Sequence, residues 1–156
     1  MSIRHARTFR RTLAVVVAIV AGACGSSSRI DPTPAPPGGT FVNIAGRWTG
    51  TIESVNLPAR TVTLTVVQSG NCVDGVWQDQ GGWTGAISGF ATADRYEGQI
   101  SLERTEAGGR CTAVGTVSGP VGERSLRWTG TGFTASSGSS CQAPLPDSVV
   151  IALQRE

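Results

Sequence analysis

The residues that could do catalytic chemistry are few, and their types exclude most enzyme mechanisms. After residue 23 the chain has no His, no Lys and one Tyr, Tyr96. It therefore lacks the groups for Ser-His-Asp or Cys-His catalysis, for a Schiff base and for a His-ligated metal. Glu97 and Glu103 share a face of a predicted strand but lie about 20 Å apart along it, whereas glycoside hydrolysis needs carboxylates about 5–10 Å apart. The sequence predicts no enzyme, no metal and no cofactor.

The N-terminal segment has the three parts of an export signal. A cationic stretch is followed by an uncharged run at 13–23, which ends in small residues directly before Cys24. The cationic residues are Arg4, Arg7, Arg10 and Arg11. The run is much shorter than the roughly 20 residues that a membrane-spanning helix needs. We therefore expect residues 1–23 to be a signal peptide.

Cys24 and the residues before it resemble the lipobox of bacterial lipoproteins. Ala21-Gly22-Ala23-Cys24 carries Ala21 where that family prefers Leu. The resemblance implies that Cys24 becomes the lipidated first residue and anchors the protein to a membrane of the cell envelope. It also implies outer-membrane sorting, in a cell with an outer membrane, because Gly25 rather than Asp follows the cysteine. An ordinary signal peptide with an incidental cysteine is the alternative.

Residues 24–45 are predicted to form a flexible tether after the lipidated cysteine. They combine a Gly/Ser stretch with a Pro-rich stretch, and such compositions form linkers rather than packed structure. Four of the 13 basic residues lie in the predicted signal peptide, so the remaining nine face 11 acidic residues and the net charge becomes −2. This balance gives no electrostatic footprint for nucleic acid, which we exclude as a partner.

From residue 46 to residue 156 the chain alternates polar and apolar side chains with a period of two, which is typical of antiparallel strands with one wet face. In one predicted strand Val62, Leu64 and Val66 share a face, and the threonines between them share the other. The predicted strands are 46–53, 60–68, 72–78, 83–92, 95–104, 111–118, 125–134 and 148–155. Because short connections suit a meander and closure removes exposed edges, we predict an all-β, eight-stranded antiparallel up-and-down barrel. An open two-sheet sandwich is the alternative.

The tryptophans indicate how such a barrel is filled. Each has a glycine two residues away on the same strand face, where a glycine permits sharp coiling beside a bulky ring. Arg-Trp-Thr-Gly-Thr occurs at both 47–51 and 127–131. In a closed barrel these two segments flank the last strand, so Trp48, Trp128 and Arg155 are expected to meet at one end, the structural floor.

Gly46-Arg47-Trp48 together with the late Arg155 resembles the pattern of the calycins, which include lipocalins and avidin-like proteins. The resemblance implies an eight-stranded barrel whose closed end places a tryptophan beneath an arginine. A longer pattern resembles Gly/Thr-rich barrel domains of uncharacterised bacterial lipoproteins. It runs through Val62-Thr-Leu-Thr-Val66, Gln68, Gly70, Val73, Gly75 and Trp77.

The strand order also assigns the cysteines. Cys111 opens the sixth predicted strand, and Cys141 lies in the long loop after the seventh, at the same end of the barrel. Cys72 opens the third strand, at the floor. We therefore expect a Cys111–Cys141 disulfide with Cys72 outside it, in keeping with an oxidising compartment.

The longer connections are expected at the end opposite the floor, where they form a mouth. Trp77, Trp83 and Tyr96 are candidate contacts for a small apolar ligand there, because such sites have apolar walls and few polar groups. Phe90 is a further candidate, although it breaks the inward parity of its strand. The alternative is a filled-core envelope module whose outer surface meets another protein or a wall polymer.

Overall fold

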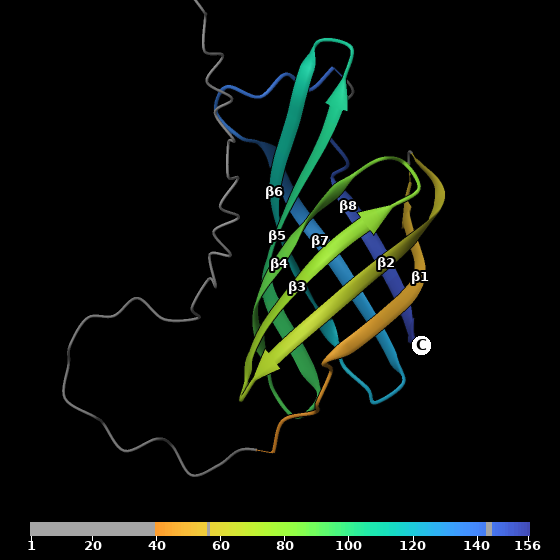
Figure 1. Cartoon of the computed structure of the whole chain (residues 1–156), viewed down its shortest axis with the longest axis vertical. Coiled ribbons are helices and arrows are strands. Elements are labelled where there is room, and N and C mark those ends of the chain that lie inside the picture. Colours follow the sequence, from red (N-terminus) through yellow and green to blue (C-terminus); the bar gives the residue numbers. More distant parts are fainter. Residues whose placement is uncertain (1–39, 56, 143–144) are drawn as a thin grey trace, which may run out of the picture.

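The computed structural model describes residues 40–55, 57–142 and 145–156, and these form an all-β barrel of eight antiparallel strands (Figure 1). The predicted signal peptide, Cys24 and the tether up to residue 39 lie outside the described residues. The strands are β1 (Gly46–Ser54), β2 (Leu57–Ser69), β3 (Cys72–Asp79), β4 (Thr84–Ala91), β5 (Arg95–Glu106), β6 (Gly109–Pro120), β7 (Ser125–Ala135) and β8 (Ser148–Arg155).

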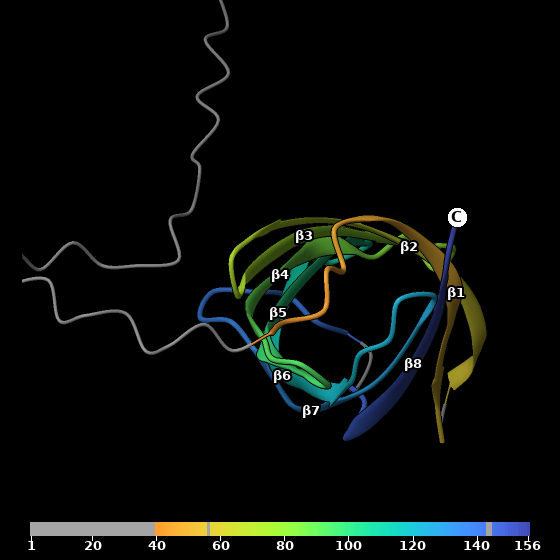
Figure 2. The ribbon, with the colours of Figure 1, turned by 90° about the horizontal axis from the view of Figure 1, so that it is seen from below.

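Each strand pairs with its neighbours in the chain, and pairing of β1 with β8 closes the sheet (Figure 2). That last ladder runs from Trp48 opposite Arg155 to Glu53 opposite Val150. The predicted barrel is thus confirmed over the open sandwich, in which each of the two sheets would leave two edges with unpaired backbone groups. The part of the chain that the structure describes contains no helix long and apolar enough to span a membrane.

The two ends of the barrel differ in their connections. The floor is the end that carries the turns at 70–71, 92–94 and 121–124, and the mouth carries those at 80–83, 107–108 and 136–147. The predicted strands 95–104 and 111–118 are too short at this end. Strands β5 and β6 continue to Glu106 and Gly109, so a hairpin with a two-residue connection projects beyond the mouth.

Large aromatic side chains fill the barrel interior. Trp48, Trp77, Trp128 and Tyr96 are each at most 1% exposed, and Tyr96 stacks on Trp128 with ring centroids 4.5 Å apart. Room for these rings comes from small residues beside them. At Gly50, a Cβ atom would lie 1.9 Å from the carbonyl oxygen of Ala152, so only glycine permits the close approach of β1 to β8 there.

The segment directly before β1 crosses the floor, which corrects the predicted boundary of the tether (Figure 2). Ile44 is fully buried in the core. Its carbonyl accepts a 2.8 Å hydrogen bond from Trp48 Nε1, and its amide donates one of 2.8 Å to Gln68 Oε1. Val42 packs against the same core. Residues 42–45 therefore belong to the barrel, because Val42 and Ile44 pack on its core and cover Trp48 at the floor.

Arg155 holds this cover in place at the floor. Its guanidinium carbon lies 4.8 Å from the ring centroid of Trp48, and its Nη2 donates a 2.7 Å hydrogen bond to the carbonyl of Asn43. The structure thus brings Arg155 and Trp48 together, while Trp128 contacts Tyr96 instead. One side chain from the last strand connects the first strand and the segment that precedes it.

Candidate ligand site at the mouth of the barrel

A pocket lies inside the barrel at the mouth end, above the filled floor half. Its cavity volume is about 90 Å³. Side chains of β1, β5, β6, β7 and β8 form its apolar wall, and the loop after β7 adds two more apolar residues. These residues are Ile52, Ile100, Leu102, Ala113, Phe133, Val149, Leu145 and Pro146. The polar side chains that reach the pocket are Arg60, Asp79 and Arg104.

Phe133 reaches the pocket because β7 contains a bulge. Along β7 the even-numbered residues Leu126 and Trp128 point inward, so simple alternation would turn Phe133 outward. The register slips where Val114 pairs with Thr134 but Thr116 pairs with Thr131, which places one extra residue on β7. Gly132 has φ of +66° there, the left-handed conformation that a G1-type bulge requires. The bulge reverses the parity of the strand and directs Phe133 into the barrel.

Arg60 and Asp79 form an ion pair at the rim of the pocket, with 3.3 Å between Arg60 Nη2 and Asp79 Oδ2. The Asp79 side chain is only 1% exposed and that of Arg60 19%. Asp79 Oδ1 accepts a 3.0 Å hydrogen bond from the backbone amide of Trp83. The carboxylate therefore fixes both the arginine and the turn that carries Trp83.

Arg104 connects Trp83 to the opposite side of the mouth. Its guanidinium lies 4.7 Å from the centroid of the Trp83 ring and pairs with Glu106. Glu106 Oε2 in turn accepts a 2.9 Å hydrogen bond from the backbone amide of Gln142, in the loop after β7. A continuous set of contacts thus extends from β2 through the 80–83 turn and β5 to the mouth loop.

The described part of the mouth loop is fastened to β6 by covalent and hydrogen bonds. Cys111 and Cys141 form a disulfide, with their Cα atoms 4.5 Å apart. Ser136 and Ser140 donate backbone hydrogen bonds of 2.9 and 3.0 Å to the carbonyls of Thr112 and Arg110. Cys72 lies outside the disulfide, at the start of β3 on the floor. The loop that carries Leu145 and Pro146 is therefore anchored beside the pocket.

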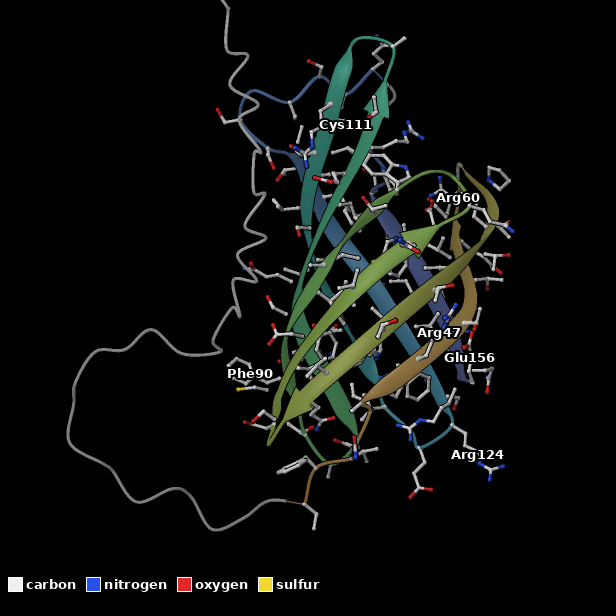
Figure 3. The ribbon with its side chains drawn as sticks, viewed as in Figure 1. Arg47, Arg60, Phe90, Cys111, Arg124 and Glu156 are labelled. Carbon is white, nitrogen blue, oxygen red and sulfur yellow. A yellow bond between two sulfur atoms is a disulfide. The ribbon has the colours of Figure 1, made fainter. Side chains whose placement is uncertain are left out.

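The structure places the aromatic residues that were predicted as ligand contacts at different parts of the barrel. Trp83 lines the pocket, whereas Trp77 is 1% exposed within the core and is not part of the pocket wall. Tyr96 lies near the floor, two residues after the turn at 92–94, where it stacks on Trp128. Phe90 is 52% exposed on the outer surface near the floor, far from Arg60 and Cys111 at the mouth end (Figure 3).

The pocket also contains four residues that were not predicted from the sequence to contact a ligand, namely Arg60, Asp79, Arg104 and Phe133. The signal for Phe133 was present, because Gly130-Thr131-Gly132 offers a second glycine where a bulge can form. Arg60 and Asp79 gave no signal, since their contact depends on the register between β2 and β3, in which Val62 lies opposite Asp79.

No protein-family model matches this chain, and no curated protein or solved structure matches it either.

Proposed function

We propose that this protein is a lipid-anchored component of the cell envelope whose barrel binds a small apolar ligand at its mouth. The observation that carries the proposal is the apolar pocket between Trp83 and Phe133, which opens among the mouth connections. The lipobox resemblance around Cys24 supports the anchor. The calycin resemblance, on Gly46-Arg47-Trp48 and Arg155, supports a binding role for a barrel of this kind.

The volume of the pocket limits what enters it. Small-molecule sites commonly enclose roughly 300–1,000 Å³, and an apolar cavity of roughly 150 Å³ accepts benzene. At about 90 Å³, this pocket takes one end of a ligand, such as the end of an alkyl chain. The remainder of the ligand then lies between Trp83 and the loop after β7. Each methylene buried contributes about 0.8 kcal/mol, so binding of a short chain is expected to be weak.

A filled-core envelope module is the second candidate, and the floor half favours it. Trp48, Trp128 and Tyr96 are buried there, and the rings of Tyr96 and Trp128 stack on each other. A groove on the outside of β3 to β6 is lined by the exposed apolar side chains of Val76 and Val114 and by polar side chains such as Glu103. An outer surface of this kind suits contact with another protein or a polymer.

Xenon distinguishes the two candidates, because it enters dry apolar cavities without needing polar partners. In the full chain carrying Cys24→Ser, which has no lipid, xenon under pressure is expected to shift the NMR signals of Ile100 and Phe133. Ala113→Leu fills the pocket and should abolish these shifts. Ala86→Leu, on the outer surface, is the matched control and should leave them intact. Absence of shifts in the unfilled barrel would favour the filled-core module.

The anchor is tested separately in the native envelope. Cys24→Ser should release the protein from membranes or leave the signal peptide uncleaved, because the lipid cannot attach to serine. Two or three acyl chains are expected on Cys24, since a single chain gives only marginal membrane binding. A mature-sized Cys24→Ser protein that still fractionates with membranes would exclude the lipoprotein assignment.

A further inference from the structure

Two buried polar atoms at the rim of the pocket have unmet hydrogen-bonding capacity. Arg60 Nε and Asp79 Oδ2 are both buried, and neither has a hydrogen-bond partner among the described residues. The 3.3 Å contact between Arg60 Nη2 and Asp79 Oδ2 brings the charges together without satisfying Nε. Buried polar groups in proteins nearly always have a partner. Both residues line the pocket, which is where a partner for them can enter.

The two side chains are held in this arrangement by their surroundings. A Cβ atom at Gly81 would lie 2.4 Å from Arg60 Nη1, so the glycine turn after β3 packs directly on the guanidinium. The Asp79 carboxylate is fixed from the other side by the amide of Trp83. The turn after β3 therefore contacts both the guanidinium and the carboxylate.

The charges around the pocket cancel, which favours an uncharged ligand. Arg60 faces Asp79, and Arg104 pairs with Glu106, so two arginines are balanced by two carboxylates. A carboxylate on the ligand would accept from Arg60 but would be repelled by Asp79. An ammonium would donate to Asp79 but would be repelled by both arginines. A hydroxyl group is both a donor and an acceptor and carries no charge.

We propose that the ligand of this pocket is an uncharged amphipathic alcohol. Its apolar end occupies the space beside Phe133, and its hydroxyl accepts a hydrogen bond from Arg60 Nε and donates one to Asp79 Oδ2. This inference rests on the proposed function, because it names the class of ligand for the same site. Hydroxyl recognition by such a pair gives selectivity that an apolar wall alone cannot, since a ligand without the hydroxyl leaves Arg60 Nε and Asp79 Oδ2 without a hydrogen-bond partner.

Calorimetric titration of the full Cys24→Ser chain with eight-carbon probes tests the inference. The probes are 1-octanol, methyl heptyl ether as an acceptor without a donor, octanoate and octylammonium. We expect 1-octanol to bind at least about tenfold more tightly than each of the others, a ratio that corresponds to about 1.4 kcal/mol. This comparison of four probes tests hydroxyl recognition in a pocket whose rim residues are all unchanged.

The variant Asp79→Asn provides a second test, because the order of affinities for 1-octanol and octanoate is expected to reverse. The substitution keeps an acceptor for the Trp83 amide and removes the negative charge, so octanoate should now bind more tightly than 1-octanol. Glu97→Gln is the matched control, because it removes a carboxylate from the exposed Arg95–Glu97 pair near the floor. The control should keep the wild-type order of affinities.

The outcomes separate this inference from the proposed function. If methyl heptyl ether or octanoate binds the wild-type pocket as tightly as 1-octanol, hydroxyl recognition is refuted while the ligand pocket remains. An unchanged preference in Asp79→Asn would also refute the role of the carboxylate. If xenon and all four probes fail to bind, the proposed function falls, and the inference falls with it.

Discussion

Replacing Arg155 by Ala is expected to destabilise the barrel by loosening its floor. The side chain lies over Trp48 at 4.8 Å and donates a 2.7 Å hydrogen bond to Asn43. A cation–π contact is worth about 0.5–2 kcal/mol, and a hydrogen bond from a charged group contributes about 1.5–3 kcal/mol net of its exchange with water. Because Arg155 is exposed, we expect a loss of about 1–3 kcal/mol in the free energy of unfolding.

Urea denaturation, with circular dichroism as the readout, measures this loss, and thermal unfolding should show a fall in Tm of roughly 4–12 °C for a domain of this size. Arg127→Ala is the matched control, since Arg127 is exposed on the outer face of β7. Its effect should stay within about 0.5 kcal/mol. Hydrogen exchange adds a local readout, because loosening of Asn43 should speed exchange of the Trp48 indole proton that is bonded to Ile44. Equal effects of the two substitutions, with unchanged exchange at Trp48, would refute the reasoning.

Three further predictions concern the disulfide, the bulge and the floor cover. Cys111→Ser with Cys141→Ser should lower the free energy of unfolding by about 3.6 kcal/mol, because the bridge closes a separation of 30 residues; an unchanged urea midpoint would contradict this. Gly132→Ala should cost about 1–2 kcal/mol in the same assay because of its positive φ, and Gly132→Asn less; equal stability of both with wild type would exclude the bulge. Ile44→Ala should cost about 2–4 kcal/mol as a buried core residue, whereas a tether residue would give no change.

The barrel and the residues at its closure can be predicted from the order of the residues along the chain. Alternation with a period of two fixes which side chains can face a common core, and short connections make neighbouring strands pair. Closing the strands in chain order then places Arg155 opposite Trp48. The same strand order places Cys111 and Cys141 at one end of adjacent strands, where the structure shows their disulfide. These results depend on order and parity, which can be read along the chain.

The composition of the pocket depends on contacts between strands that the sequence does not predict. Phe133 enters it because the register of β7 against β6 slips at Gly132, and a slip of one residue turns a side chain to the other face. Arg60 and Asp79 meet because of the register between β2 and β3, and Ile44 is buried because the floor has room for it. The strand register, the bulge in β7 and the burial of Ile44 at the floor all result from packing between segments that are distant in the sequence. A local sequence pattern does not predict these features, because the free energy of each contact depends on a residue from a distant strand that only the closed barrel places beside it.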